Sequence, residues 1–309
     1  SLMEAHLILG IGELLWDILP QGRQLGGAPA NFAVMAAQLG NHAAILSRIG
    51  EDELGRKAIE QLDSLPADAS HLQVDPAHET GRVTVAFADG QPSYTIHQPA
   101  AWDFMEVTDL WVQLAERADA LCFGSLAQRS RVSRQTIQAL VAQSSETCIR
   151  VFDVNLRAPF YSGEVIEESL DLATVVKMND AEAPRVLEML GLLDQSDSAH
   201  GSLRLCAERL LDEFPLLQMV AVTRGAQGSL LVTRDEWSEH PGFPVQVADT
   251  IGAGDAFTAA MTHYLLRGAG METLNEAGNR WGAWMASRSG AMPVLPEAVR
   301  AGIAAEIED

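Results

Sequence analysis

Residues 249–257 read Asp-Thr-Ile-Gly-Ala-Gly-Asp-Ala-Phe, so two glycines, a short turn and a carboxylate stand in front of an apolar run. Gly252, Ala253 and Gly254 can turn with little steric penalty and leave successive backbone N–H groups pointing outward. Residues 256–266 are then expected to continue as a helix, whose dipole and unpaired N–H groups favour an anion at this end. A phosphoryl group in transit, with its charge spread over several oxygens, suits such a hole. The spacing therefore predicts phosphoryl-transfer chemistry.

Asp255 stands at the edge of this predicted anion hole. A carboxylate beside a phosphate would repel it, unless the carboxylate accepts the proton of a hydroxyl that attacks the phosphorus. The alternative is an acidic residue in the first turn of a helix, which stabilises the helix through its dipole. We predict the catalytic base, because other segments of the chain also fit a phosphotransferase.

The charge of the chain excludes several classes of partner. The chain has 21 Lys and Arg residues against 42 Asp and Glu residues, which gives a formal net charge of −21. Such a chain is expected to bind neither nucleic acid nor an anionic membrane. A small phosphate ligand remains compatible, because backbone dipoles and Mg²⁺ can bind it locally. With 309 residues the chain can form one large core, or one core with a smaller appendage.

Cysteine usage and hydropathy indicate the compartment. Cys122, Cys148 and Cys206 lack the spacing of metal ligands, and the first two lie in apolar runs typical of buried strands. No run reaches the ~18 apolar residues that a membrane-spanning helix needs. The N-terminus has neither a basic region nor a cleavage site. These features favour a reducing cytoplasm as the location.

Apolar runs rich in Val, Ile and Leu alternate with helical patterns along the chain, at separations that fit crossover helices. The alternation predicts an α/β fold with a doubly wound, mostly parallel sheet that is flanked by helices and binds ligands at the carboxyl ends of its strands. Asn155, Asn179 and Thr223 lie near such ends. The expected strands are residues 120–124, 149–154, 173–178, 219–223 and 229–233.

Two segments, residues 13–24 and 81–97, break this rhythm. The second contains two alternating apolar stretches around Asp89 and Gly90, which is the pattern of a β-hairpin. Strands without crossover helices, in an otherwise α/β chain, are expected to form a small β-sheet that projects over the site as a lid.

We expect a single α/β domain over residues 3–309, with lid segments at about 13–25 and 81–98 inserted in it. The strands of the lid would leave an open edge, and pairing lid to lid in a homodimer is one way to cover that edge. The apolar residues of the hairpin fit such a dimer, and they fit a solitary half-buried lid equally well.

Two familiar nucleotide-binding motifs are absent from the sequence. No Gly-x-x-x-x-Gly-Lys-[Ser/Thr] occurs, which excludes a P-loop. Gly10-Ile-Gly12 follows an apolar run as a dinucleotide site would, but Leu15 stands where the third glycine belongs. A dehydrogenase with a Rossmann-type fingerprint is therefore disfavoured.

Residues 249–257 resemble the second signature of the ribokinase/PfkB family of carbohydrate kinases. The first signature of that family is recognisable in residues 26–33, which read Gly-Gly-Ala-Pro-Ala-Asn-Phe-Ala. The resemblance runs from about residue 10 to residue 293, and residues 12–17 and 99–103 look most similar to bacterial fructokinases. Further family segments follow in the expected order: residues 48–55, 152–157, 177–182 and 223–228.

The resemblance implies a ribokinase-like fold and a role for each site residue. Asp255 would be the base that deprotonates a sugar hydroxyl, and residues 252–254 would be the anion hole for the γ-phosphate. Asp17, Gly27 and Asn31 would bind the sugar, through oxygens that chelate hydroxyls and a close approach to the backbone. Without the family pattern, a tight turn would explain Gly27 and a helix start would explain Asn31.

The remaining assignments concern the nucleotide. Arg157 would reach a sugar hydroxyl or an ATP phosphate, with an ordinary surface ion pair as the alternative. Asn179 and Glu182 resemble the Asn-x-x-Glu element that organises Mg²⁺ and phosphates through water, although the same spacing also makes a capping box. The nucleotide would be lined by four further residues: Thr223, Gly225, Gly228 and Asn279.

A monovalent-cation site is a further implication of the resemblance. Asp249 with the backbone of Ile251, and the loop 287–290 that ends in Gly290, resemble the K⁺ site that many relatives place beside the anion hole. A bound K⁺ would polarise that turn, and carbonyl ligands leave no trace in a sequence.

The sequence therefore predicts that ATP with Mg²⁺ phosphorylates a primary hydroxyl of a small sugar, in a cleft between the α/β domain and its lid. D-Fructose is the favoured acceptor. Ribose, 2-keto-3-deoxygluconate and nucleosides such as adenosine remain alternatives, because the short stretch 16–26 departs from the family pattern in the lid. A non-catalytic sugar or nucleotide sensor is the alternative of another class, disfavoured because a sensor needs no base at position 255.

Overall fold

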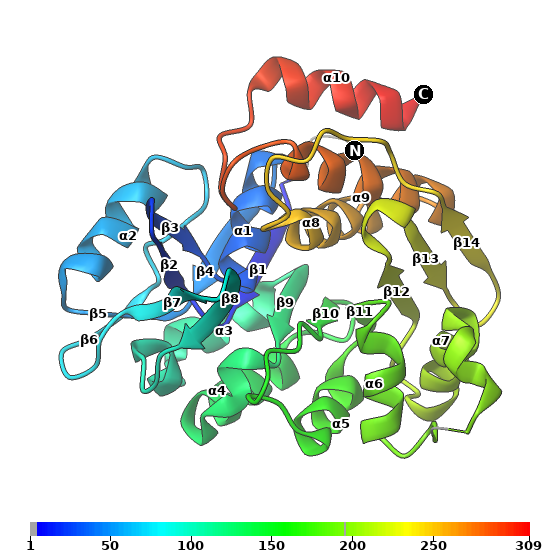
Figure 1. The fold of residues 1–309 in the computed structure, drawn as a ribbon, viewed down its shortest axis with the longest axis horizontal. Coiled ribbons are helices and arrows are strands. Elements are labelled where there is room, and N and C mark those ends of the chain that lie inside the picture. The colour runs from blue at the N-terminus through cyan, green and yellow to red at the C-terminus, as the bar shows by residue number, and fades with distance from the viewer. Residues whose placement is uncertain (1–4, 195) are drawn as a thin grey trace.

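The computed structural model describes residues 5–194 and 196–309, and its largest element is an eight-stranded sheet (Figure 1). From one edge to the other, the strands are β14 (Trp237–His240), β13 (Ser229–Val232), β12 (Met219–Thr223), β11 (Val175–Asn179), β10 (Ile149–Asp153), β9 (Ala120–Gly124), β1 (Leu7–Ile11) and β4 (His42–Leu46). The six strands from β12 to β4 are parallel. Strand β13 pairs antiparallel with both β12 and β14.

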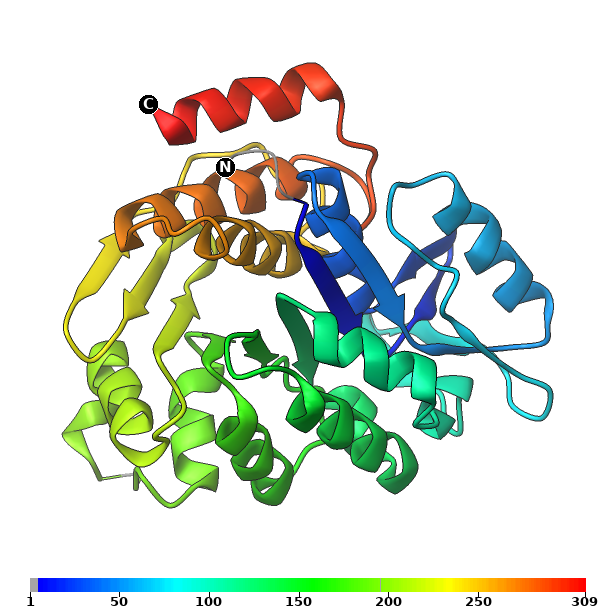
Figure 2. The same cartoon turned by 180° about the vertical axis from the view of Figure 1, so that it is seen from behind.

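Helices cover both faces of this sheet (Figures 1 and 2). One face carries α1 (Ala28–Gln38), α8 (Ala253–Leu265) and α9 (Met271–Ala286), with α10 (Glu297–Glu308) packed outside α9. The other face carries α3 (Asp109–Arg117), α4 (Arg131–Gln143), α5 (Gly163–Leu172), α6 (Glu182–Met189) and α7 (Leu203–Glu213). No helix in the described part of the chain is long and apolar enough to cross a bilayer. Short 3₁₀ turns lie at η1 (Ala101–Phe104), η2 (Leu126–Arg129), η3 (Ser198–Gly201) and η4 (Gly225–Gln227).

Each face of the sheet has its own core of buried apolar side chains. Leu9 and Ile11 of β1 point into one core, and Ile8 between them points into the other, as the alternation of a strand requires. A parallel sheet buried on both faces is the arrangement that crossover helices produce. The predicted fold class, a doubly wound and mostly parallel sheet, is confirmed.

All five strands expected from the apolar runs are present, as β9 to β13. The largest shift is at β11, which begins at Val175 and ends on Asn179 rather than spanning residues 173–178. Strand β14 had no prediction, because Trp-Ser-Glu-His carries neither an apolar run nor an alternating pattern of sufficient length.

A separate four-stranded sheet, in the order β3-β2-β7-β8, is formed by the two segments that broke the α/β rhythm. Asp89 and Gly90 both have positive φ angles, 52° and 77°, which is the backbone that a tight hairpin turn requires. Its strands are β2 (Leu15–Leu19), β3 (Gly22–Gly26), β7 (Gly81–Ala88) and β8 (Gln91–Ile96). The short strands β5 (Arg48–Gly50) and β6 (Gln73–Asp75) pair beside it, and α2 (Glu53–Asp63) accepts a hydrogen bond from Trp16 Nε1 through the Leu54 carbonyl at 2.9 Å.

Helix α8 begins at Ala253, three residues before the expected start. Gly252 alone makes the turn, with a left-handed φ of 79° that glycine adopts without strain. Gly254 and Asp255 therefore lie in the first helical turn rather than in a loop before it.

Candidate active site

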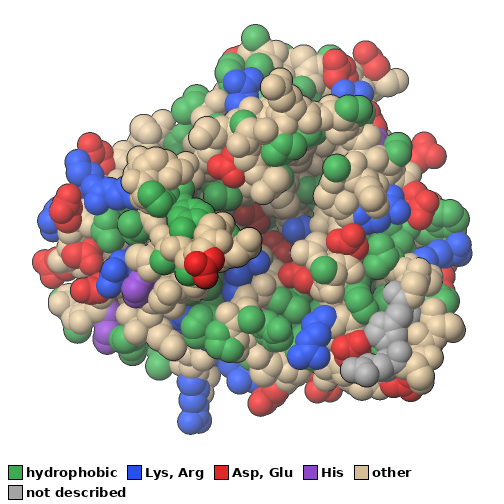
Figure 3. All heavy atoms as spheres, viewed as in Figure 1, with side chains coloured by type: hydrophobic (Ala, Val, Ile, Leu, Met, Phe, Trp, Pro, Cys, Tyr) green, Lys and Arg blue, Asp and Glu red, His purple; other side chains and the backbone are tan. Residues whose placement is uncertain are grey.

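The candidate site lies at the carboxyl ends of the parallel strands, where the first turn of α8 faces them. Strand β10 ends on Asp153, β11 on Asn179 and β12 on Thr223. Figure 3 shows a hollow in the middle of this face, beside the small sheet, with acidic and basic side chains inside it. Ligands of doubly wound sheets bind at this edge.

Asp255 and Asn31 meet at this edge although 224 positions separate them. Asn31 Nδ2 donates a hydrogen bond to Asp255 Oδ2 at 2.9 Å. Asn31 is buried in α1, whose preceding residue Gly27 has a φ of 106° and stands too close to the Glu13 carbonyl for any Cβ. The structure thus brings together the predicted base and two of the predicted sugar-binding residues.

The pKa of the Asp255 carboxyl is raised. Burial and the nearby charge of Asp153 raise the pKa of Asp255 from 3.8 to about 6, against the opposing effects of Lys177 and the Asn31 hydrogen bond. A carboxylate with a pKa near the working pH is ionised yet basic enough to accept a proton. Asp255 also stands in the first turn of α8, where its charge would stabilise the helix dipole, so the alternative role remains open.

Of the three backbone N–H groups of residues 252–254, one is already used within the protein. Ala253 N–H donates to the Thr250 carbonyl at 3.3 Å. The N–H groups of Gly252 and Gly254 have no acceptor among the described residues. The predicted anion hole therefore has two free donors within the turn rather than three.

Lys177 lies beneath this turn, and the sequence analysis assigned it no role. A Cβ placed on Gly254 would lie 2.8 Å from Lys177 Nζ, so a side chain there would displace the lysine amine. Lys177 is buried, and its Nζ is 3.7 Å from Asp153 Oδ1. Burial lowers the pKa of Lys177, but the carboxylates of Asp153, Asp255 and Glu182 outweigh it and raise that pKa. A lysine within the otherwise apolar strand Val-Val-Lys-Met was the available signal.

Glu13 is the second site residue that the sequence analysis left without a role. It follows β1, and only 3 % of it is exposed. Burial raises the pKa of Glu13 to about 7, helped by Asp255 and Asp153 and opposed by its own backbone and by Arg157. A glutamate two residues after a buried strand was the signal in the sequence.

The Asn179 and Glu182 side chains have the geometry of a capping box. Asn179 Oδ1 accepts from Glu182 N at 2.8 Å, and Glu182 Oε1 accepts from Asn179 N at 2.9 Å. Glu182 Oε2 also accepts from Leu156 N at 2.7 Å, which fixes the loop that carries Arg157. Both carboxylate oxygens therefore already hold a backbone N–H, and each keeps a second lone pair for water.

Arg157 and Asp17 come from different segments, the loop after β10 and strand β2. Arg157 is exposed, donates only to the Leu156 carbonyl at 3.2 Å, and pairs with no carboxylate in the described residues. Its charge nevertheless acts on both Asp17 and Asp255. Burial and the charge of Asp249 raise the pKa of Asp17, and Arg157 opposes them. These contacts do not support the surface ion pair that was the alternative for Arg157.

The glycines of the 225–228 turn differ in what requires them. A Cβ on Gly228 would stand 1.8 Å from the His240 carbonyl, so contact with the end of β14 requires glycine there. A Cβ on Gly225 would meet nothing within 4 Å, although its φ is 58°. Thr223 precedes this turn at the end of β12.

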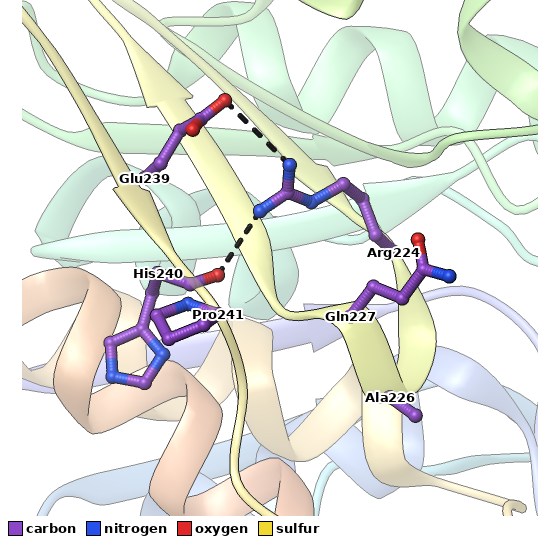
Figure 4. A pocket seen from close by; sticks show the side chains of 6 residues that line it. All are labelled: Arg224, Ala226, Gln227, Glu239, His240 and Pro241. Carbon is purple, nitrogen blue, oxygen red and sulfur yellow. Dashed lines mark hydrogen bonds and ion pairs between the residues drawn. The ribbon is translucent and has the colours of Figure 1, made fainter.

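A surface pocket of about 570 Å³ adjoins the same turn (Figure 4). Arg224 crosses it, donating to the His240 carbonyl at 3.1 Å and lying 3.6 Å from the Glu239 carboxylate. The other lining residues are Ala226, Gln227 and Pro241.

Asn279 is bound within the protein. Its Nδ2 donates to Ser229 Oγ at 2.7 Å and to the Asn275 carbonyl at 2.8 Å. The bond to Ser229 ties α9 to β13, the bond to Asn275 stays within α9, and only the amide oxygen remains for a nucleotide. The sequence could not show this, because the partner Ser229 lies 50 residues away.

The three residues of the predicted cation site are joined by hydrogen bonds. Asp249 Oδ1 accepts from Ile251 N at 2.9 Å, and Asp249 Oδ2 accepts from Gly290 N at 3.2 Å. Asp249 therefore connects the loop before α8 with the loop after α9. No group of three or more His, Cys, Asp and Glu side chains in the described residues is arranged to hold a metal ion.

The fold and this edge define a class of phosphotransferase, and comparisons with known proteins agree. The model of the pfkB family of carbohydrate kinases matches residues 21–298. The fructokinase of Escherichia coli is 30% identical over 312 residues, which cover 93% of this chain and 95% of the relative. The chain belongs to the pfkB family of carbohydrate kinases.

Two solved structures show the same fold. A fructokinase from Vibrio cholerae, solved with fructose, ADP and a calcium ion, has a TM-score of 0.79 and 26% identity, covering 98% of this chain and 99% of that one. An uncharacterized sugar kinase from Pyrococcus horikoshii has a TM-score of 0.78 and 28% identity, with 93% of both chains covered. This chain is accordingly an enzyme that transfers a phosphoryl group to a carbohydrate.

Proposed function

We propose that this enzyme uses ATP to phosphorylate a primary hydroxyl of D-fructose, with Asp255 as the base. The observation that carries the proposal is the position of Asp255: held by Asn31, in the first turn of α8, beside two free backbone donors. A base and an anion hole within one helical turn are what attack on a γ-phosphate requires.

The ionised Asp255 carboxylate accepts the proton of the sugar hydroxyl, whose oxygen forms a bond to the γ-phosphorus as the bond to the β,γ-bridging oxygen breaks. The products are the sugar phosphate and ADP. The N–H groups of Gly252 and Gly254, with the charge of Lys177 beneath them, would stabilise the phosphoryl oxygens during this transfer.

Mg²⁺ is expected with ATP, where it would neutralise phosphate charge. Asn179 and Glu182 would orient it through water, which fits because each Glu182 oxygen keeps one free lone pair beside its backbone donor. The nucleotide would lie beside Thr223, Gly225, Arg224 and the neighbouring pocket. Gly228 and Asn279 would support these residues through their contacts with β14 and β13.

The sugar side rests on Asp17, Gly27, Asn31 and Arg157. Asp17 stands on β2 and Asn31 on α1, so the acceptor would lie between the small sheet and the large one. We propose that the small sheet acts as a lid, which would exclude water as a competing acceptor. Fructose is favoured by the name of the E. coli relative and by the ligand of the V. cholerae structure. Ribose, 2-keto-3-deoxygluconate and nucleosides are the alternatives.

Three finer proposals complete this function. K⁺ would bind near Asp249, Ile251 and Gly290, next to the anion hole. Two copies of the chain would pair through the lid. Its aromatic side chains Phe87 and Tyr94 are 61% and 67% exposed, and a second copy would cover them. The enzyme would work in the cytoplasm.

The test is ADP release with MgATP and K⁺ over a panel of neutral sugars, sugar acids and nucleosides. Turnover that depends on fructose would support the proposal. Turnover with another acceptor would replace fructose and keep the chemistry. Absence of turnover across the panel, from protein with an intact thermal transition, would favour the sensor.

A further inference from the structure

Four buried oxygen atoms around the candidate site have no hydrogen-bond donor. Among the described residues, the structure leaves five buried side-chain oxygens unpartnered, and the fifth is Ser47 Oγ. An unmet buried acceptor is costly, and folded proteins hold few of them. The four are Glu13 Oε2, Gln24 Oε1, Asn31 Oδ1 and Asp153 Oδ1.

These oxygens belong to one neighbourhood. Asn31 holds Asp255, and Asp153 faces Lys177 beneath Gly254. Glu13 lies close enough to Asp255 and Asp153 for its charge to act on both. Gln24 stands opposite Asp17 in the small sheet. The segments that carry the base, the turn and the small sheet thus each contribute an unmet acceptor.

With Glu13 ionised, all four atoms can only accept hydrogen bonds, so the missing partner must donate. A metal ion is not the partner that the geometry suggests, because no set of three His, Cys, Asp or Glu side chains in the described ranges is arranged for one. Sugar hydroxyls are donors, and a polyhydroxy sugar carries several of them at fixed spacing.

We propose that Glu13 is a sugar-binding residue whose Oε2 accepts a hydrogen bond from a hydroxyl of the acceptor. The proposal rests on the proposed kinase function and adds a residue and a selection rule to it. A site lined by acceptor oxygens selects a neutral polyhydroxy sugar over a sugar acid, because the carboxylate of a sugar acid brings no donor and would meet the ionised Asp255.

Of the four residues with an unpartnered oxygen, Glu13 allows the most specific experiment. Its carboxyl is almost fully buried and has an orphan oxygen, and Glu13→Gln keeps the shape while removing the negative acceptor. At pH 8, where Glu13 is ionised, loss of the hydrogen bond from the sugar to this charged group should raise the KM for fructose by about 10-fold or more. We expect kcat to change by less than about 3-fold. Glu60→Gln, on the exposed face of α2, is the matched control and should leave both constants unchanged.

Combining sugar analogues with Glu13→Gln distinguishes a direct contact between Glu13 and the sugar from an indirect structural effect. Fructose analogues in which fluorine replaces one hydroxyl at a time retain size but cannot donate. We expect one analogue to raise the KM of the wild type about 10-fold and to raise that of Glu13→Gln by less than about 2-fold, because the partner is already absent. Equal effects of every analogue on both proteins would overturn the proposal, as would an unchanged KM for fructose in Glu13→Gln.

The outcomes also separate this proposal from the proposed function. If the wild type phosphorylates no sugar, the function fails before Glu13 is tested. If fructose is phosphorylated and the two proteins respond alike, an ordered water partners Glu13 and only this inference is wrong. A wild-type kcat/KM higher for 2-keto-3-deoxygluconate than for fructose would overturn the selection rule.

Discussion

Asp75 is buried and Asp255 is half-buried, and their pKa values move in opposite directions. Asp75, at the end of β6, accepts from Arg48 Nε at 2.9 Å, from His78 Nδ1 at 2.9 Å and from Ala77 N at 2.8 Å. Burial raises the pKa of Asp75, but these hydrogen bonds outweigh it and bring that pKa to about 2. Asp255 has one side-chain donor, Asn31, and a pKa of about 6.

The difference lies in the number of donors that the fold supplies. Asp75 is satisfied internally, so its charge stabilises the junction of β5, β6 and the loop that follows. Asp255 and Glu13 have fewer donors, and under our proposal a ligand completes them. A buried carboxylate with an unmet oxygen therefore marks function better than burial alone does.

The largest effect is expected for Asp255→Asn. The substitution keeps an oxygen for Asn31 but removes the base, so kcat should fall at least ~10²-fold with little change in the affinity for ATP. Steady-state ADP release and nucleotide titration measure the two quantities. Asp75→Asn is the contrast, with kcat per folded molecule close to the wild type. A kcat unchanged in Asp255→Asn would return Asp255 to stabilising the start of α8.

Lys177→Met should lower kcat by about 10-fold to 100-fold, because the positive charge beneath Gly254 is lost. The acid limb of the kcat profile should also move to higher pH, since Lys177 lowers the pKa of Asp255. The double variant Lys177→Met with Asp153→Asn removes both members of the ion pair and guards against an unpaired buried charge. A double variant with wild-type kcat would show that Lys177 only balances Asp153.

The sheet was largely predictable, because strand and crossover helix each leave a periodic pattern. Asp255 and Asn31 were predictable because they sit in signatures beside glycines. Glu13 and Lys177 were not assigned, since each stands next to or inside an apolar run and gains its meaning only when distant strands converge. Gly228 shows the reverse: its place in a motif pointed to the nucleotide, whereas the His240 carbonyl already requires a glycine there.

Neutralising Asp75 should lower the free energy of unfolding, whereas neutralising Glu13 should raise it. Asp75→Asn leaves Arg48 and His78 without their anion and should lower the free energy of unfolding by about 3 kcal/mol at pH 7. Glu13→Gln should raise the free energy of unfolding at pH 8 by about 2 to 3 kcal/mol, because the native state then buries no charge there. Thermal or urea unfolding of both variants across pH measures this.

The pH dependence of the Glu13 effect follows from its raised pKa. Between the unfolded value near 4.5 and the native value of about 7, the native state holds a proton that the unfolded state has lost. Stability of the wild type therefore falls as pH rises through this window, and the advantage of Glu13→Gln grows from small at pH 5 to full above pH 7. A constant difference at all pH values would contradict the assigned pKa.

The smallest effect is expected from K⁺ near Asp249. The number of hydrogen bonds that Asp249 accepts lies between those of Asp75 and Asp255. Its two oxygens hold the backbone N–H groups of Ile251 and Gly290, so the fold itself already joins these loops. A cation held by carbonyls beside them would add about 1 to 2 kcal/mol at concentrations ten-fold or more above its Kd. KCl should then raise the thermal midpoint and kcat relative to choline chloride at equal ionic strength. Identical midpoints and rates would show that the two hydrogen bonds of Asp249 hold the turn before α8 without a cation, just as internal hydrogen bonds alone satisfy Asp75.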